Sequence, residues 1–349
     1  MPELRKDIIT REWVILAKER AKRPSDFLTD ERQIHEEPEW DPKCPFCPGN
    51  EALTPPEILA YRPRHQPPNG PGWQVRVMTN KFAALQSAGE PNRREVGIYD
   101  AMEGIGAHEV VVESPGHNKS LGQMGVGQVE KVIWAYLDRY NALREDPRLR
   151  YILIFRNHGK VAGSSLTHPH SQIVAMPVIP QKVWAKITGV EQYREYREKC
   201  PYCDIVEYET RVKERIICEN DSFIACTPYA SRSPFESRIM PRRHQPCFAN
   251  MSRIEIGEFA QILREVLARL HSCLRDPPYN LTLLNIPCSP DRSYDFHWHL
   301  EIIPRLTTPA GFEMGTSIYI DVTSPEEAAQ YLREASCPLP PIGGPSRTV

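Results

Sequence analysis

A pattern of cysteine and histidine residues occurs twice along the chain, and it constrains the fold more than any other feature of the sequence. Each copy contains a Cys-x-x-Cys turn, then a single histidine, then a His-x-His pair. The first copy comprises Cys44, Cys47, His117, His168 and His170, and the second comprises Cys200, Cys203, His244, His297 and His299. The single histidine precedes the pair by 51 residues in the first copy and by 53 in the second. A repeat of this length indicates two duplicated halves rather than short stacked units.

Two thiols and two imidazoles form the ligand set of a tetrahedral zinc site. We therefore predict a structural zinc with four protein ligands, Cys44, Cys47, His117 and His168. Buried thiols beside a surface histidine are the alternative for any such set taken alone, and the repetition argues against it. A second metal is predicted at Cys200, Cys203, His244 and His297. Glu209 and His299 offer a rival set with an oxygen ligand, which would suit iron or zinc.

Length and charge restrict the class of protein. A chain of 349 residues suggests two domains, which we place at 1–190 and 191–349. The formal charge of -2 gives no electrostatic signature of binding to nucleic acid or to an anionic membrane. No apolar run approaches the roughly 18 residues of a membrane span, and the N-terminus lacks the apolar centre of a signal peptide. We expect a cytoplasmic protein whose ten cysteines are thiols or metal ligands.

The order of predicted elements is the same in both halves. Helical spacing of apolar residues marks 122–145 and 253–275 as the two long helices. In each half, strands precede the helix and two further strands follow it; the following strands are 151–157 and 167–177, then 279–287 and 296–304. This order predicts an α+β fold made of two tandem halves, each with antiparallel sheet and one long helix on one face. The polar stretch 178–199 is the predicted boundary.

The residues that follow the first zinc ligands are suited to phosphoryl chemistry. Alternate residues of a strand share one face, so His168, His170 and Gln172 project together. A zinc that fixes His168 would hold His170 beside it, and a neutral imidazole is a good nucleophile toward phosphorus. Gln172 and the hydroxyl of Ser165 could donate hydrogen bonds to phosphoryl oxygens. The alternative is a strand whose histidines only bind metal.

The second copy differs at one decisive position. Glu301 follows His299 where Gln172 follows His170, and a carboxylate there would repel a phosphate. We therefore predict that the first half is catalytic and that the second is structural. A basic cluster near the N-terminus, Arg20, Lys22 and Arg23, is either a solvated charge run or a diphosphate clamp made of arginine forks.

Several short motifs of the sequence resemble those of a known family. RAKRP, CPFC, VMTNKFAAL, SPGH, FRNHG, HPHSQ and GFEMG fall in the order seen in galactose-1-phosphate uridylyltransferases. That family is the nucleotidyl transferase branch of the histidine-triad superfamily. The resemblance covers roughly residues 4–330, and its most specific part is the HPHxQ element with an upstream Cys-x-x-Cys.

The resemblance implies a ping-pong reaction. UDP-glucose would give UMP to His170, and galactose 1-phosphate would then take it. The match also assigns the zinc ligands named above and the following groups that bind substrate: Arg20, Arg23, Ser165 and Gln172 for phosphates, Asn80 and Asn157 near the nucleotide, and Phe312 and Glu313 for the hexose. In the family the hexose element comes from the partner subunit of a dimer, so a homodimer with a shared site is expected.

The chain departs from the family pattern in ways that concern the substrate. Lys81 replaces a common aspartate, and Phe312 replaces a tyrosine of the hexose loop. The second Cys-x-x-Cys is absent from many such transferases. In having it, the chain is similar to a plant relative that acts as an ADP-glucose phosphorylase. The main prediction is UDP-glucose–hexose-1-phosphate uridylyltransferase of galactose metabolism. The alternative is ADP-glucose phosphorylase, which transfers AMP to phosphate, and a non-catalytic zinc-dependent interaction module is a remote third.

Overall fold

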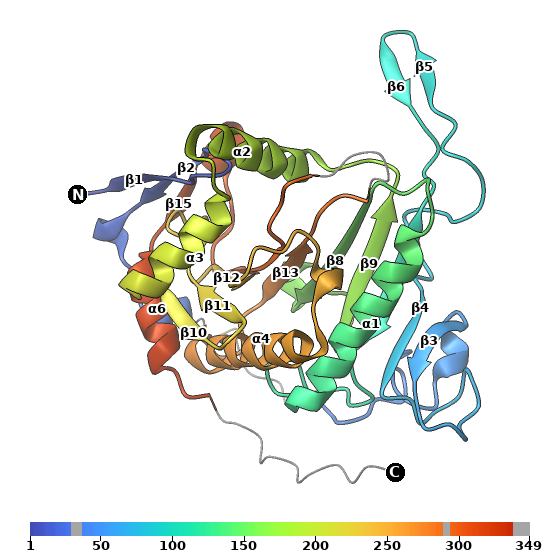
Figure 1. Ribbon diagram of the computed structural model, residues 1–349. Helices are drawn as coiled ribbons and strands as arrows, with labels where there is room; N and C mark the ends of the chain where they lie inside the picture. Colours follow the sequence, from blue (N-terminus) through green and yellow to red (C-terminus); the bar gives the residue numbers. More distant parts are fainter. Residues whose placement is uncertain (29–36, 289–293, 338–349) are drawn as a thin grey trace.

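A ten-stranded antiparallel sheet forms the centre of the molecule (Figure 1). The structure is a computed structural model that describes residues 1–28, 37–288 and 294–337. The strand order is β10-β11-β12-β14-β13-β8-β9-β7-β4-β3. The bounds are β3 Glu57–Tyr61, β4 Val75–Thr79, β7 Ala107–Val112, β8 Tyr151–His158 and β9 His170–Met176, then β10 Ile216–Glu219, β11 Phe223–Cys226, β12 Ser237–Pro241, β13 Tyr279–Leu284 and β14 His299–Pro304.

Each half of the chain contributes five strands to this sheet in the same succession. The halves meet where β8 pairs antiparallel with β13, with Phe155 opposite Thr282. The predicted α+β class and the repeated antiparallel halves are confirmed, but the two sheets are joined into one. Residues 178–199, predicted as a polar boundary, contain the helix α2, Gln181–Arg197. The division into domains 1–190 and 191–349 stays a prediction, and residues 338–349 of the second lie outside the described part.

The two long helices pack side by side on one face of the sheet (Figure 1). They are α1, Val126–Arg144, and α4, Arg253–Leu274, and both confirm the helices expected from apolar spacing. Their buried residues and the strands' inward side chains form the main hydrophobic core. Burying this apolar surface is the dominant stabilising term for the fold.

The opposite face of the second half is covered by α2 and by α3, Pro201–Val212. Strand side chains alternate between the faces, so Phe223 packs with α4 whereas Ile224 packs with α3. A small sheet lies beside these helices, formed by β1 (Glu3–Lys6), β2 (Trp13–Leu16) and β15 (Tyr319–Asp321). The short helix α5, Gly311–Thr316, precedes β15, and α6, Pro325–Glu334, follows it.

The remaining elements are short. A hairpin of β5, Arg94–Val96, and β6, Tyr99–Ala101, projects away from the body of the molecule (Figure 1). In the described part of the chain, five 3-10 helices connect larger elements: η1 Lys18–Arg20, η2 Pro24–Phe27, η3 Glu51–Leu53, η4 Lys160–Ala162 and η5 Phe248–Asn250. Within the described residues, none of the helices has the length and apolar character needed to cross a bilayer.

Candidate active site and metal centres

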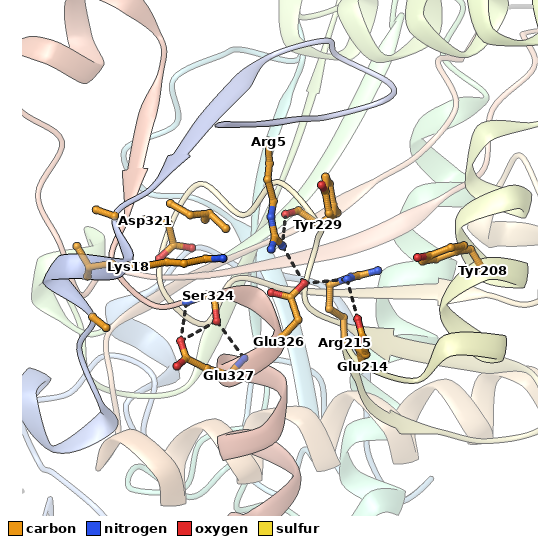
Figure 2. A pocket seen from close by; sticks show the side chains of 14 residues that line it. Arg5, Lys18, Tyr208, Glu214, Arg215, Tyr229, Asp321, Ser324, Glu326 and Glu327 are labelled. Atoms are coloured by element: carbon orange, nitrogen blue, oxygen red, sulfur yellow. Dashed lines mark hydrogen bonds and ion pairs between the residues drawn. The ribbon is translucent and has the colours of Figure 1, made fainter. Parts of the chain in front are cut away.

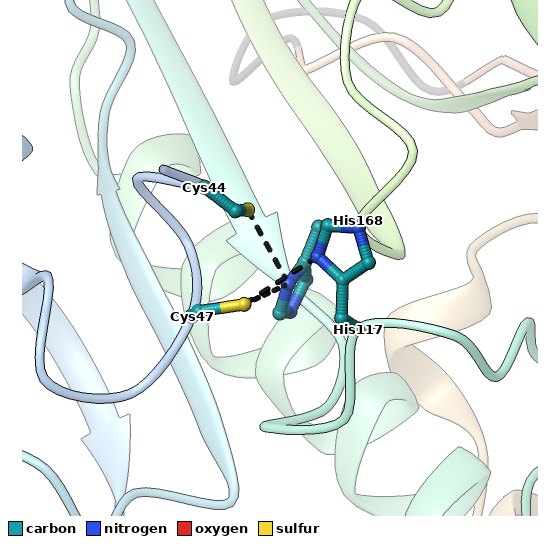
Figure 3. A group of neighbouring side chains, drawn as sticks. All are labelled: Cys44, Cys47, His117 and His168. Atoms are coloured by element: carbon teal, nitrogen blue, oxygen red, sulfur yellow. Dashed lines mark hydrogen bonds between the residues drawn. The ribbon is translucent and has the colours of Figure 1, made fainter. Parts of the chain in front are cut away.

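The four predicted ligands of the first metal site lie together and are buried (Figure 3). Cys44 and Cys47 come from the turn before η3, His117 from the loop after β7, and His168 from the residues just before β9. Cys47 Sγ lies 3.4 Å from His117 Nδ1 and 3.6 Å from His168 Nδ1, and Cys44 Sγ lies 3.7 Å from His168 Nδ1. Zinc–sulfur and zinc–nitrogen bonds of ordinary length at a tetrahedral angle give a separation of about 3.6 Å. The residues therefore fit a closed zinc site.

The outer nitrogens of both histidines have hydrogen-bond partners that favour metal binding through Nδ1. His168 Nε2 donates to the carbonyl oxygen of Ser114 at 2.8 Å, which leaves Nδ1 unprotonated in the neutral ring. His117 Nε2 lies 3.0 Å from Thr167 Oγ1. Burial lowers the pKa of His168 to about 4, so its ring is neutral at pH 7. Such partners orient the rings of metal-binding histidines.

The second copy assembles in the same way around the N-terminus of α3. Cys203 Sγ lies 3.5 Å from His244 Nδ1 and 3.6 Å from His297 Nδ1, and Cys200 Sγ lies 4.0 Å from His297 Nδ1. His297 Nε2 donates to the carbonyl oxygen of Pro241 at 2.9 Å, as its counterpart does in the first half. The two halves thus share one ligand geometry, and both could bind zinc.

The rival oxygen-containing set is not assembled. Glu209 Oε1 accepts a hydrogen bond from Arg215 Nε at 3.0 Å. His299 Nδ1 lies 2.9 Å from the carbonyl oxygen of His297 rather than at the thiols. Among the described residues, the ligand atoms that gather at this place belong to Cys200, Cys203, His244 and His297.

His170 is the first residue of β9, and its ring is held in one tautomer. The side chain is 8 % exposed, and burial lowers its pKa below the ordinary value. Nδ1 lies 2.8 Å from the carbonyl oxygen of His168, an acceptor, so Nδ1 carries the proton. The lone pair is therefore on Nε2. A neutral imidazole with an unprotonated Nε2 is the form that can attack an electrophilic phosphorus.

Gln172 lies on the same face of β9, and its amide is oriented by a residue that sequence reasoning missed. The backbone N–H of Ala84 donates to His108 Nδ1 at 3.1 Å, so the proton of His108 is on Nε2. His108 Nε2 then donates to Gln172 Oε1 at 2.7 Å. Asn80 Nδ2 also donates to this oxygen, at 3.3 Å. These contacts fix the orientation of the Gln172 amide, with its N–H groups directed away from His108 and Asn80.

A buried charged network supports β9 from the helix side, and it too was missed. Arg156 Nε donates to Glu113 at 3.0 Å, and Arg156 Nη1 donates to Tyr279 Oη at 2.7 Å. Ser171, between His170 and Gln172, donates to Glu113 and contacts Tyr136 Oη at 2.6 Å. Charged residues inside otherwise apolar predicted strands were the available signal. The network fixes the strand that carries His170.

The other predicted residues of the first half lie near this face. Asn157 is on β8, and its Oδ1 accepts a hydrogen bond from Asn280 Nδ2 at 2.8 Å. Ser165 is exposed in the loop between η4 and His170. The structure thus groups His170, Gln172 and Asn80, with Asn157 and Ser165 on neighbouring segments of the same half.

The predicted phosphate and hexose residues of the terminal segments lie elsewhere. Arg20 and Arg23 flank a turn whose Lys22 N–H donates to the carbonyl oxygen of Val322 at 2.9 Å, beside β15. Phe312 and Glu313 are on α5, which packs against β15. Figure 1 shows the β1-β2-β15 sheet on the far side of the molecule from β9. Within one chain, these four residues are not brought to His170.

A family model described as the N-terminal domain of galactose-1-phosphate uridyl transferase matches residues 1–180, which hold the first metal site and His170. The chain belongs to the galactose-1-phosphate uridylyltransferase family. A second model, described as a domain of unknown function (DUF4921), matches residues 109–335.

Two types of relative are similar over almost the whole chain. ADP-glucose phosphorylase of Arabidopsis thaliana is 35% identical, over 96% of this chain and 93% of its own. Galactose-1-phosphate uridylyltransferase of Thermotoga maritima is 33% identical, over 96% of this chain and 98% of its own. A crystal structure of the Arabidopsis phosphorylase with bound ADP-glucose superposes with a TM-score of 0.80 at 32% identity, covering 96% of this chain and all of that one. A uridylyltransferase structure superposes with a TM-score of 0.72 at 28% identity, covering 95% of this chain and 97% of that one.

Proposed function

We propose that the protein transfers a nucleotidyl group through a covalent intermediate on His170. The lone pair of Nε2 attacks the α-phosphorus of a sugar nucleotide; a P–N bond forms, and the bond to the bridging oxygen breaks. Hexose 1-phosphate leaves with that oxygen. An oxygen of the acceptor phosphate then attacks the same phosphorus, the P–N bond breaks, and the neutral imidazole is restored. The observation that carries this proposal is the fixed Nδ1–H tautomer of His170 beside the metal ligand His168.

The groups around His170 supply stabilisation for the developing charge. The Gln172 amide, oriented by His108, would donate to a phosphoryl oxygen in the transition state. Asn80 and Asn157 are proposed to lie near the nucleotide, and Ser165 near its phosphates. Zinc at Cys44, Cys47, His117 and His168 would have four protein ligands, so its role is to hold three segments of chain together. The site at Cys200, Cys203, His244 and His297 would do the same for the second half.

We propose ADP-glucose as the donor and inorganic phosphate as the acceptor. The sequence alone favoured UMP transfer to galactose 1-phosphate. The similarity to ADP-glucose phosphorylase, and the superposition on a structure that contains ADP-glucose, support AMP transfer better. The replacement of the family's tyrosine by Phe312 agrees with an altered hexose site.

Hexose-1-phosphate uridylyltransferase is the second candidate. Its support is the 33% identity to the Thermotoga enzyme over nearly the full length of both chains. The same residues would act in either case, because both reactions pass through a nucleotidyl-histidine. The difference lies in the base of the donor and in the acceptor.

The proposed substrate residues imply a shared active site. Arg20, Arg23, Phe312 and Glu313 lie beside β15, away from His170 of the same chain. If they bind the phosphates and hexose, a second copy of the chain must bring them to His170. We therefore propose a homodimer in which each site combines the first half of one subunit with the β15 region of the other.

A matrix of donors and acceptors tests the assignment of substrate. ADP-glucose and UDP-glucose would each be mixed with phosphate or with galactose 1-phosphate, and release of glucose 1-phosphate would be followed. The proposal expects the highest kcat/KM for ADP-glucose with phosphate. Faster turnover of UDP-glucose with galactose 1-phosphate would establish the second candidate instead.

A further inference from the structure

A cavity of about 420 Å³ lies in the second half, away from His170. Its walls come from the end of β1, from α2 and α3, and from the residues that follow β11. Three tyrosines and five apolar residues contribute to the lining: Tyr193, Tyr208 and Tyr229, with Ile8, Ile205, Cys226, Pro228 and Ala230. A cavity of this size with aromatic walls is of the kind that holds small organic molecules.

Two residues that line this cavity carry buried polar atoms without a partner. Arg238 Nε and Glu209 Oε2 are buried and have no hydrogen-bond partner within the described part of the chain. Both side chains are more than nine-tenths buried. A buried donor or acceptor left unpaired costs free energy, so such atoms call for a partner from outside the chain. Both atoms lie just beneath the cavity wall, on side chains that line it.

The register of the sheet relates this cavity to the candidate active site. In the first half, Met78 of β4 pairs with Val110 of β7, which pairs with Gln172 of β9. In the second half, Cys226 of β11 pairs with Arg238 of β12, which pairs with Glu301 of β14. Cys226 and Arg238 thus hold the positions of Met78 and Val110, and Pro228 the position of Asn80. The cavity occupies the place that corresponds to the substrate face of the first half.

The catalytic position itself is filled in the second half. His299 is fully buried, and Glu301 accepts from Lys186 at 2.8 Å and from Arg232 at 3.1 Å. Since these ion pairs occupy the place where a phosphate would react, the second half has no room for transfer chemistry. What remains open is the part of the face around Cys226 and Pro228, on the side that corresponds to Asn80.

Two of the three cations along the cavity are already paired with carboxylates, Arg215 with Glu209 and Arg238 with Glu301, which argues against a phosphate ligand. The lining has three cations and three acids. Arg215 bonds to Glu209 and to Glu326, and a neighbouring cavity of about 570 Å³ shares Arg215, Tyr208 and Tyr229 with this one. Figure 2 shows Glu326 between Arg5 and Arg215 in that neighbouring cavity. These carboxylates would repel an added phosphate, whereas they would not repel an uncharged ring.

We propose that this cavity binds a nucleoside without phosphates, or a free nucleobase. The tyrosines would stack on the planar ring, as aromatic side chains do on bases in sequence-tolerant binding. The side chains of Arg238 and Glu209 would turn toward the ring, so that Arg238 Nε donates to a ring acceptor and Glu209 Oε2 accepts from a ring N–H or amino group. The proposal goes beyond transfer through His170 and rests on that function for one step, the correspondence with a nucleotide-binding face.

Photolabelling with 8-azidoadenosine and 5-azidouridine, followed by peptide mapping, tests the proposal. We expect label in the tryptic peptides 200–211 or 216–232, and competition by unlabelled adenosine or uridine. Tyr208→Ala removes a stacking ring, and Ile8→Trp fills the rim of the cavity from an exposed position. Each should weaken this labelling at least about fivefold. Tyr196→Ala, an exposed tyrosine of α2 that does not line the cavity, is the matched control and should leave the labelling unchanged.

The outcomes separate this inference from the proposed function. Label confined to peptides of residues 1–180 with both probes, or cavity label unaffected by both variants, would overturn it. His170→Ala should abolish nucleotidyl transfer and keep the cavity label. Tyr208→Ala should lose the cavity label and keep the covalent adduct on His170, so either claim can fail without the other.

Discussion

At the residue scale, the two His-x-His pairs have the same backbone contact and opposite surroundings. The Nδ1 atoms of His170 and His299 both lie within 2.9 Å of the carbonyl oxygen of the preceding histidine. His299 is fully buried in contact with Lys186, and burial lowers its pKa to about 3. His170 instead shares its face with Gln172. The local motif was enough to predict this difference, because Gln172 and Glu301 are each two residues from the histidine.

The hydrogen bond from His108 that orients the Gln172 amide was not predictable from the motif. His108 reaches it across strands, since Val110 of β7 pairs with Gln172 and places His108 near the amide. That contact depends on the register in which β7 pairs with β9, and the two strands come from distant segments of the chain. Local sequence patterns do not determine such a register. The metal ligands, by contrast, were found because their spacing recurs.

Replacing Gln172 tests the role of its amide. Gln172→Glu would remove a donor and place a negative charge beside the phosphate, so we expect kcat to fall at least about 10²–10³-fold, the effect of losing one oxyanion donor. Gln172→Met, which removes the donor without adding charge, should lower kcat by a smaller factor. Steady-state kinetics on both variants decides the matter, and wild-type kcat in Gln172→Glu would exclude the role.

At the element scale, the long helices were predictable and α2 was not. Helices α1 and α4 have continuous apolar stripes, and α4 begins with a capping box in which the Ser252 N–H donates to Glu255 at 2.7 Å. The sequence of α2 is polar overall and was interpreted as a boundary. Its buried Val183, Ile187 and Val190 nevertheless recur at helical spacing, which was the signal available.

The cap of α4 should make stability depend on pH. The hydrogen bond from Arg243 is the largest of the interactions that lower the pKa of Glu255 to about 2, against an ordinary 4.5. A carboxylate with a lowered folded-state pKa contributes stability above the unfolded value, and loses it as pH falls from about 4.5 toward 2. Urea unfolding at pH 7 and pH 3.5 should show that Glu255→Gln destabilises more at pH 7. Equal destabilisation at both values would contradict this assignment.

At the scale of the whole molecule, the two halves share one sheet. The junction of β8 with β13 joins strands more than 120 residues apart in the chain, and no local pattern indicates that two edge strands will pair rather than stay apart. The internal repeat predicted two similar halves, but it did not predict that their sheets would join into one through β8 and β13. The same union leaves β9 and β15 on opposite sides, so the residues of the candidate site are divided between two regions.

The number of zinc ions per chain should show whether each of the two metal sites is occupied. Each ligand set joins distant segments, and formation of such sites is coupled to folding. We expect about two zinc ions per chain by elemental analysis, and about one in either Cys44→Ser or Cys203→Ser. A strong chelator should lower Tm in the wild type. Cys273→Ser, a cysteine outside both sets, is the control and should retain both ions.

Mixing inactive variants tests the shared active site. In a hybrid of His170→Ala and Glu313→Ala subunits, one of the two sites would contain both native residues. Random exchange of subunits should restore about a quarter of wild-type activity from two variants that are each nearly inactive. If the site is formed within one chain, the mixture will stay as inactive as its components.

The central claim is that His170 forms a covalent nucleotidyl intermediate. Protein would be mixed with ADP-glucose or UDP-glucose labelled at the α-phosphate, without an acceptor, then denatured and digested. We predict acid-labile label on the peptide that contains His170, more from ADP-glucose than from UDP-glucose, with none in His170→Ala. Absence of label from both donors on the wild type, or equal label on His170→Ala, would contradict the account.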